Sequence, residues 1–395
     1  MNVKKKQTLL FLFCYLSYAS LYVARLNLSM ASPDLKELGL LTSAQIGLLG
    51  SVFSIIYAVG RLVNGILSDH VPSWVMICPG LLLAGLSNLA IGFFPPFVGI
   101  LILWGANSFA QSMLWSAIMR TLSVFFDPET AKKRVSFLMS SVPVGNLICI
   151  LACSRIISVW GVKWAFLIPG GITLLLGIVM FPMLRPVQFP KISGQGKPIA
   201  GMVSMLRNPE IQTLFAPTVF HGMIKDNVTL WMTVFFVDRY GIDLETSALF
   251  IFFIPLMGFF GRTVYPLCYR LCGKEEHRVS QYAFVLSTVG AILLCLPVSP
   301  VVAMISMSGI YAVIMIANTS FLAIYPIRFT AEGRVASVSG LMDFVTYLGA
   351  SVASLVYGVL QERFGYLPMF LSWAAVSFIS FLIMSYILKK TRQPA

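Results

Sequence analysis

The sequence predicts an all-α polytopic membrane protein with twelve transmembrane helices in two pseudo-symmetric bundles of six. Three observations predict this fold class. Hydrophobic residues make up 58% of the 395 residues and charged residues only 11%, whereas a soluble globular protein carries about 25% charged residues. Apolar runs of spanning length recur along the whole chain. Polar landmarks of the first half return in order in the second half. This combination argues against a soluble enzyme.

Each predicted helix is an apolar run long enough to cross the hydrocarbon core, which takes about 20 residues. The runs are separated by short connections that carry turn or helix-breaking residues, such as Pro95-Pro96 and Asp127-Pro128. Pro143, Pro169 and Pro255 fall inside runs, which membrane helices tolerate. The expected spans are 7–31, 44–66, 74–94, 97–122, 135–158, 164–184, 209–237, 245–268, 279–297, 301–326, 335–360 and 367–388.

The longest connection, 185–208, divides the chain into two domains. It is rich in Pro, Gly, Ser, Lys and Arg and has no periodicity, so we expect a cytoplasmic linker between an N-terminal bundle, 1–184, and a C-terminal bundle, 209–395. Four landmarks recur across it at offsets of 200 to 204 residues, which indicates duplication and, for parallel repeats, a solute site between the halves. They are Arg25 and Lys225, Gly60-Arg61 and Gly261-Arg262, Arg134-Val135 and Arg334-Val335, and Gly161 and Gly365.

The net charge of +13 is explained better by membrane topology than by nucleic-acid binding. No loop holds a long basic stretch, so we expect no nucleic-acid partner. With the N-terminus in the cytoplasm, eighteen basic loop residues lie on the cytoplasmic side and four on the other, namely Lys36, Lys163, Arg239 and Arg363. The positive-inside rule then places both termini in the cytoplasm. The expected location is the lipid bilayer of a plasma (inner) membrane.

Polar residues form helical stripes on four of the apolar runs. Residues three or four apart share one helix face, and a charge at mid-bilayer costs at least about 2.5–3.5 kcal/mol. Such stripes therefore predict a wet, cationic interior cavity. The stripes are Tyr18, Tyr22, Arg25 and Ser29; Ser54, Tyr57, Arg61, Asn64 and Ser68; Asn107, Gln111 and Trp115; and His221, Lys225 and Thr229.

A cationic cavity of this kind suits a small anionic solute. Arg25 offers a planar fork that matches phosphate or carboxylate, and Lys225 offers a point charge. A phosphate ester carries close to two negative charges near neutral pH, and these two cations, one from each half, could each neutralise one. The tyrosines could add hydrogen bonds, while Trp115 and Trp231 could contact an organic moiety.

Plainer explanations exist for several of these residues. Arg61 could pair with Asp69, and Lys225 could pair with Asp226 or Asp343. His221 could be a satisfied polar residue rather than a proton carrier. Asp226 and Asp343 could act as salt-bridge partners or as coupling sites. The predicted span of Arg25, 7–31, contains no acidic residue, so a purely structural role fits Arg25 least well.

Motifs for enzyme chemistry are missing from the sequence. It contains no P-loop, no nucleophile with a matching base, and no spacing typical of a metal site. We therefore expect neither an enzyme nor a bound metal or cofactor.

The segment from Gly65 to Asp69, followed by His70, resembles the G-x-x-x-D-R loop motif of the major facilitator superfamily, with His in place of the usual Arg. A more specific resemblance is to its organophosphate:phosphate antiporter family, which includes glycerol-3-phosphate and hexose phosphate transporters. It covers essentially the whole chain. The residues that carry it are Tyr22-x-x-Arg25-x-Asn27, Arg61, Gln111-x-Met113-x-Trp115 with Arg120-Thr121, Ser136-Phe137, Val144-Gly145, Lys225 with Trp231, Gly340, and Tyr347-Leu348-Gly349-x-Ser351.

This resemblance implies a bacterial, monomeric carrier that exchanges an organophosphate for inorganic phosphate by rocker-switch alternating access. It also implies a substrate site formed by Arg25, Lys225, Arg61, Tyr18, Tyr22, Tyr57, Gln111, Trp115, His221 and Trp231, with Gly65 and Asp69 in the gating motif. Two positions depart from the family pattern: Lys225 replaces an arginine, and Val142 replaces a histidine of the glycerol-3-phosphate transporter. Two alternatives stay open, a proton-coupled symporter of a sugar acid or other carboxylate and a transporter-like sensor of sugar phosphate.

Overall fold

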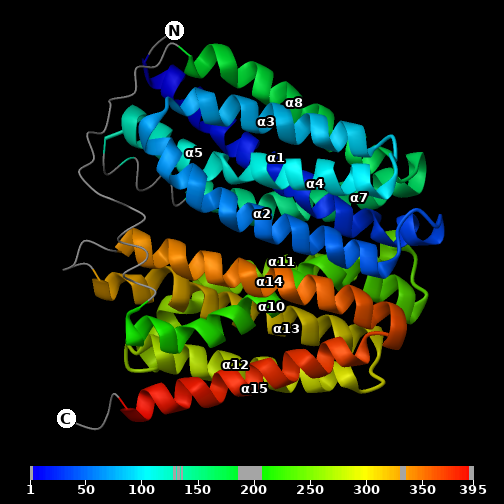
Figure 1. Ribbon diagram of the computed structural model, residues 1–395, viewed down its shortest axis with the longest axis vertical. Coiled ribbons are helices and arrows are strands. Elements are labelled where there is room, and N and C mark those ends of the chain that lie inside the picture. The colour runs from blue at the N-terminus through cyan, green and yellow to red at the C-terminus, as the bar shows by residue number, and fades with distance from the viewer. Residues whose placement is uncertain are drawn as a thin grey trace. The chain divides into compact units, whose positions relative to one another are not determined.

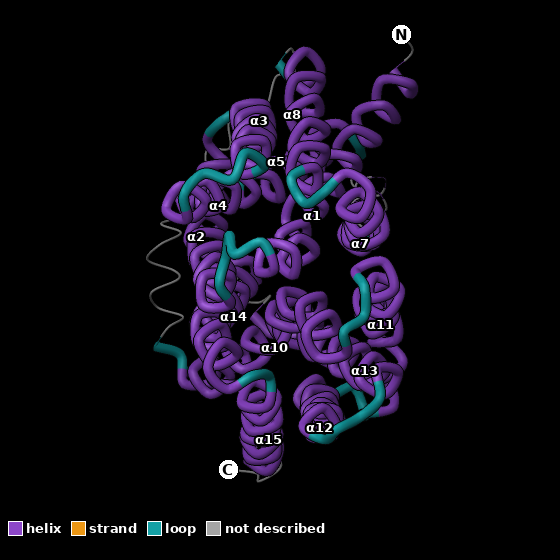
Figure 2. The backbone as a smooth tube through the Cα atoms, turned by 90° about the vertical axis from the view of Figure 1, so that its right-hand side faces the viewer, coloured by secondary structure: helices purple, strands orange, loops and turns teal. Residues whose placement is uncertain are grey.

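The computed structural model describes residues 3–127, 130, 134, 137–185, 207–329 and 335–390, and these residues form helices joined by short loops (Figures 1 and 2). The helices follow one another as α1 (Val3–Glu37), α2 (Ser43–His70), α3 (Ser73–Ile91), α4 (Phe97–Ser112), α5 (Leu114–Phe125), α7 (Ser141–Trp160), α8 (Trp164–Leu184), α10 (Pro209–Tyr240), α11 (Leu244–Leu271), α12 (Glu276–Cys295), α13 (Pro300–Thr319), η1 (Ser320–Ile324), η2 (Tyr325–Phe329), α14 (Val335–Phe364) and α15 (Leu367–Lys390).

Within the described ranges, eleven segments are long and apolar enough to cross a membrane. One of them, Phe97–Leu122, combines α4 and α5. The 32-residue helix α10 is not among the eleven. Its length suffices, about 48 Å at 1.5 Å per residue, but polar and charged residues such as His221, Lys225 and Asp226 lower its hydropathy. The all-α polytopic fold predicted from the sequence is confirmed.

The chain divides into two compact units. Unit 1 comprises Met1–Leu41 and Val52–Gln195, and unit 2 comprises Thr42–Ser51 and Gly196–Ala395. The first residues of α2 thus belong to unit 2 and the remainder to unit 1. Residues 186–206 of the predicted linker lie outside the described residues, so its bounds stay a prediction.

Helix pairs recur in the two units. Helices α1 and α7 pack together in unit 1, as α10 and α14 do in unit 2. The same holds for α3 with α8 and for α12 with α15, the latter visible side by side along their length (Figure 1). These are the matching pairs of a duplicated six-helix arrangement.

Glycines at equivalent positions make the close helix crossings. On α7, a Cβ at Gly145 would lie 2.5 Å from the carbonyl oxygen of Ala19 on α1. On α14, a Cβ at Gly349 would overlap the carbonyl oxygen of Val219 on α10. Ala19 and Val219 are 200 residues apart, and the two glycines 204 apart. Small residues let membrane helices approach closely, so the duplication is retained in the backbone contacts themselves.

A second pair of crossings follows the same offset. A Cβ at Gly60 on α2 would overlap the Ser112 side chain, and one at Gly261 on α11 would overlap the backbone of Ala312 on α13. The residues that follow, Arg61 and Arg262, are therefore presented by helices packed in the same way. The pseudo-symmetry predicted from the landmarks is confirmed by these contacts.

Helix irregularities occur inside one span and at the end of another. Between α4 and α5 the Met113 N–H donates to Ala110, which closes a tight turn, although no Pro or Gly stands there. After α13 the chain continues as a π-helical turn, η1, and then a 3₁₀ turn, η2, which contains Pro326. Proline cannot donate to the helix ladder, which explains why the helix does not continue. The prolines predicted inside spans leave their helices continuous, Pro169 in α8 and Pro255 in α11.

Candidate functional site

Two arginines of unit 1 flank one tyrosine ring. The Arg25 guanidinium of α1 lies 4.6 Å from the centroid of the Phe53 ring and 5.1 Å from that of Tyr57, both on α2. The Arg61 guanidinium, one turn along α2, lies 5.7 Å from the same Tyr57 centroid. Rings at this distance attract a cation through their negative faces. The structure therefore brings Arg25, Tyr57 and Arg61 together, as the stripes on the two helices predicted.

An aromatic cluster lies one to two turns before Arg25 on α1. The ring centroids of Tyr18 and Tyr22 are 5.4 Å apart, and those of Tyr18 and Trp115 are 5.2 Å apart. Tyr18 is buried, whereas Tyr22 and Trp115 are half-buried. The helices α1 and α5 thus place three of the predicted site residues in mutual contact.

Buried amides fix the α1 backbone beside Arg25. The carbonyl oxygen of Ala24 accepts hydrogen bonds from Asn107 at 3.2 Å and from Asn88 at 3.4 Å. The amide of Gln111 donates to Asn107 at 3.1 Å, and that of Asn27 donates to Asn88 at 2.8 Å. Gln111 is therefore part of this buried network. It hydrogen-bonds Asn107 on its own helix, α4, and Asn107 in turn contacts the backbone of α1.

The C-terminal part of the polar stripe on α2 makes hydrogen bonds to neighbouring helices. Asn64 donates to the Ser112 hydroxyl at 2.8 Å. Arg120 of α5 donates to the carbonyl oxygens of Ser68 and Val71 at 2.5 and 2.6 Å, which satisfies carbonyls at the end of α2. Gly65 lies within α2, and the side chain of Asp69 lies outside the described residues.

Lys225 of α10 has two partners in unit 2. Its ammonium lies 3.4 Å from the carboxylate of Asp226 and 4.6 Å from the centroid of the Tyr347 ring. Lys225 is 8% exposed, and Asp226 is half-buried. The pairing with Asp226 considered from the sequence is therefore present. Asp343 is half-buried on α14, one turn before Tyr347.

His221 and Trp231 of unit 2 are fully enclosed. Both are 0% exposed. The His221 ring packs edge-on against Phe321, with 6.0 Å between the ring centroids. Neither nitrogen of His221 makes a hydrogen bond of normal geometry within the described chain. The imidazole interacts weakly with the backbone of Ile314. The Trp231 indole nitrogen likewise has no acceptor among the described groups. The predicted contact of Trp231 with an organic moiety of the solute stays a prediction.

Two aromatic residues of these sites were not among the predicted site residues. Phe53 lies beneath Arg25, and Tyr347 lies beneath Lys225. The signal for Phe53 was its position four residues before Tyr57, which places both on one face of α2. Tyr347 stands one turn after Asp343, so the same spacing rule applies to it.

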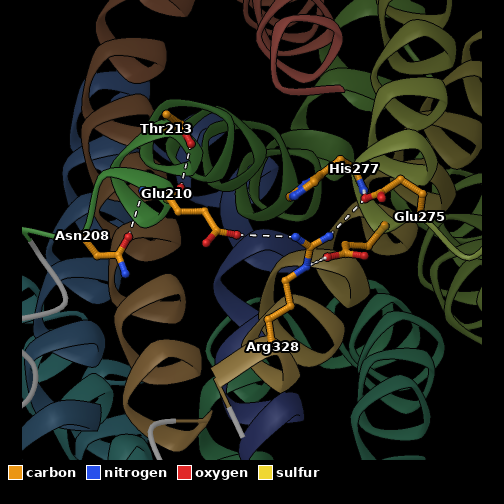
Figure 3. Close-up of polar contacts among 7 residues, drawn as sticks. Asn208, Glu210, Thr213, Glu275, His277 and Arg328 are labelled. Carbon is orange, nitrogen blue, oxygen red and sulfur yellow. Dashed lines mark hydrogen bonds and ion pairs between the residues drawn. The ribbon is translucent and has the colours of Figure 1, made fainter. Parts of the chain in front are cut away.

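A separate ionic cluster lies at the end of the unit 2 helices (Figure 3). Arg328 of η2 contacts three carboxylates: Glu276 at 2.5 Å, Glu275 at 3.3 Å and Glu210 at 3.5 Å. Partial burial opposes the charge on Arg328, but the hydrogen bond to Glu276 and the charges of the three acids outweigh it and raise the pKa of Arg328. The cluster ties α10, α12 and η2 together. Glu275, Glu276 and His277 also place ligand atoms within 4.8 Å of one another, but the Arg328 cation contacts two of these carboxylates.

Comparison with known proteins identifies relatives of this chain. It is 24% identical over 270 residues to the membrane sensor protein UhpC of Salmonella typhimurium, covering 63% of this chain and 61% of that protein. The chain thus spans less than two thirds of that relative. It is 24% identical over 420 residues to the glycerol-3-phosphate transporter of Haemophilus influenzae, covering 89% of this chain and 85% of that protein. The predicted resemblance to the organophosphate antiporter family is confirmed by these relatives.

A solved structure and a family model agree on the fold. A crystal structure of the nucleoside transporter NupG superposes with a TM-score of 0.81 at 13% identity, covering 95% of this chain and 99% of that one; at this identity the likeness shows the fold alone. The relatives are transporters and a sensor, not enzymes. The model of the Major Facilitator Superfamily matches residues 14–354, and with a match over that much of its length the chain belongs to the Major Facilitator Superfamily.

Proposed function

We propose that this chain is a secondary active transporter that exchanges a phosphorylated small organic anion for inorganic phosphate by alternating access. The observation that supports it most directly is the pair of arginines, Arg25 and Arg61, held around the Tyr57 ring inside membrane spans. The name of one relative, a glycerol-3-phosphate transporter, supports the same class of solute.

Phosphate suits the chemistry of these arginines. An arginine at mid-bilayer costs at least about 2.5–3.5 kcal/mol, so its presence inside a membrane span points to a role. A phosphate group is dianionic and accepts bidentate hydrogen bonds from the guanidinium fork. Binding such a solute is therefore a role that fits Arg25 and Arg61.

Lys225 supplies the charge contributed by unit 2, and Asp226 modulates it. The 3.4 Å pair with Asp226 means that an incoming anion competes with a carboxylate for the ammonium. A dianionic phosphate competes better than a monoanionic carboxylate, because its Coulomb attraction to the same cation is larger.

We propose that the protein is a monomer in a bacterial inner membrane, with both termini in the cytoplasm. Its partners are the solute, inorganic phosphate and the lipid bilayer. The eleven apolar spans and the bacterial relatives support the membrane location, and the distribution of basic residues supports the orientation.

The test is counterflow in proteoliposomes loaded with inorganic phosphate, with labelled phosphate or phosphate esters outside. Wild-type protein should exchange phosphate, Arg25→Ala should lose exchange, and Arg25→Lys should retain only a small part of it, because lysine lacks the planar fork. Arg185→Ala is the matched control, since its guanidinium also lies over a ring, that of Phe181 at 5.4 Å, but at the end of a span. Wild-type rates in Arg25→Ala would refute the assignment of Arg25.

Two other functions have a specific observation in their favour. The contact between Asp226 and Lys225 fits a proton-coupled carboxylate symporter in which Asp226 is protonated. Uptake driven by a pH gradient without internal phosphate would select that function. The resemblance to UhpC fits a sensor, and solute binding without any counterflow would select that one.

A further inference from the structure

Arg262 is a basic residue inside the membrane span of α11, in a position that the site residues above do not include. It is the nineteenth of 28 residues, and nine residues separate it from the helix end at Leu271, a rise of about 14 Å. An arginine side chain does not cover that distance, so its charge does not reach the end of the helix. The side chain is half-buried.

The contacts of Arg262 are too weak to compensate a charge. A terminal nitrogen of its guanidinium lies 3.2 Å from the thioether sulfur of Met315 on α13, and a thioether is a weak acceptor. No carboxylate forms an ion pair with Arg262 within the described part of the chain. The sequence explains this, because neither α13 nor the rest of α11 after Glu245 contains an acid. A half-buried cation inside a span, with a thioether as its hydrogen-bond partner in the described part of the chain, indicates a partner that arrives from outside the protein.

The internal repeat gives an independent indication. Gly60-Arg61 and Gly261-Arg262 are equivalent, and the two glycines make the equivalent close crossings. Arg61 shares the Tyr57 ring with Arg25 in unit 1. By the same relation, Arg262 of α11 is the counterpart that accompanies Lys225 of α10 in unit 2.

His221 lies near both of these cations. It sits one turn from Lys225 on α10 and is within electrostatic range of both Lys225 and Arg262. Its ring is fully enclosed, and its nitrogens make no hydrogen bond of normal geometry in the described chain. An enclosed imidazole near two cations supplies a ring N–H donor for an anion that the cations attract.

We propose that Arg262 is a solute-binding residue that, with His221 and Lys225, binds a phosphate group on unit 2. The inference rests on the proposed function and deepens it. Each unit then carries two cations on its first two helices. Such a set favours a dianionic phosphate group over a monoanionic carboxylate, because each added cation attracts the second charge as strongly as the first.

The experiment measures phosphate counterflow for Arg262→Gln, Arg262→Lys and a control, Arg270→Gln, which removes an exposed arginine at the end of the same helix. Arg262→Gln should raise the KM for inorganic phosphate about tenfold to a hundredfold, the usual loss for one hydrogen bond to a charged group, with a smaller change in the maximal rate. Arg262→Lys should recover part of this, because it retains the charge. Arg270→Gln should match the wild type.

A thermal-shift measurement separates binding from folding. Inorganic phosphate should raise the melting temperature of the wild type and of Arg270→Gln, because a ligand stabilises the state that binds it, and raise that of Arg262→Gln much less. Arg262→Met retains the apolar packing against Met315 and should fold while showing the same loss. An unchanged KM in Arg262→Gln, or loss of stability without loss of phosphate response, would overturn this inference. Absence of phosphate exchange in the wild type would instead reject the proposed function, while a rise in melting temperature with inorganic phosphate that Arg262→Gln loses would still support the assignment of Arg262.

Discussion

Replacing Gly222 by alanine should force α10 and α14 apart beside Lys225. A Cβ at Gly222 would lie 2.7 Å from the carbonyl carbon of Thr346, and would overlap the carbonyl oxygen of that residue even more closely. Ordinary contact begins at 3.4 Å, so the helices must separate by at least about 0.7 Å at this crossing. The obstacle is backbone, which cannot rotate away as a flexible side chain can. Forced overpacking of this kind costs about 1–3 kcal/mol.

The same displacement reaches the candidate site. Lys225 is one turn from Gly222, and Tyr347 follows Thr346 directly, so the 4.6 Å contact between Lys225 and Tyr347 spans the disturbed crossing. A misplacement of about 1 Å can cost about a hundredfold in rate where groups must be aligned. We expect Gly222→Ala to lose more than tenfold in counterflow rate and to unfold at a lower temperature.

The assay pairs thermal unfolding in detergent with counterflow in proteoliposomes. Gly340→Ala is the matched control, since it lies on α14 and a Cβ there meets nothing within 4 Å. That variant should be unchanged or stabilised by about 0.5–1 kcal/mol, because alanine favours helix over glycine. If Gly222→Ala proved as stable and as active as Gly340→Ala, the close crossing would not be what positions Lys225.

Three further predictions concern other parts of the molecule. Arg328→Met should lower the free energy of unfolding by about 1–3 kcal/mol, because it leaves buried carboxylate oxygens without a donor. The 38% exposure of Arg328 keeps the loss below that expected for a fully buried ion pair. Adding Glu276→Gln should restore most of the loss, as measured by thermal unfolding. Hydrogen bonds from Thr246 lower the pKa of Asp243 below its ordinary 3.8. The contribution of Asp243 as a helix cap is therefore present above pH 3.8 and is lost as the pH falls through the lowered pKa. Asp243→Asn should lose this pH dependence of stability in unfolding curves taken between about pH 5 and 3. Asn27→Ala should cost about 1–3 kcal/mol, because its amide donates two buried hydrogen bonds; equal melting temperatures would contradict this.

The sequence predicted the spans because hydropathy and length decide them. It was least informative where polar residues enter a span. Helix α10 carries Lys225 and Asp226, and its hydropathy alone does not distinguish it from a soluble helix, whereas its place in the repeat does. The break at Met113 leaves no composition signal, because neither proline nor glycine stands there.

Prediction of the candidate site divides in a similar way. Helical spacing grouped Tyr57 with Arg61 on one face of α2, and the structure places the Arg61 guanidinium 5.7 Å from the Tyr57 ring centroid. Spacing could not say which polar residues bind other helices. Asn107 shared the stripe of Trp115, yet it donates to the Ala24 carbonyl of α1 in a buried network. Arg262 stood in a repeat landmark, and its contact with the Met315 thioether could be seen only in three dimensions.

The glycine crossings have a consequence for how this protein can change during evolution. At Gly145 and at Gly349 the facing helices touch through carbonyl oxygens, so no side chain is needed to fit one helix to the other. Side chains at neighbouring positions, such as Lys225, are therefore not needed to hold the two helices together. A lineage can exchange these side chains, and with them the preferred cargo, while the frame that carries them keeps its shape.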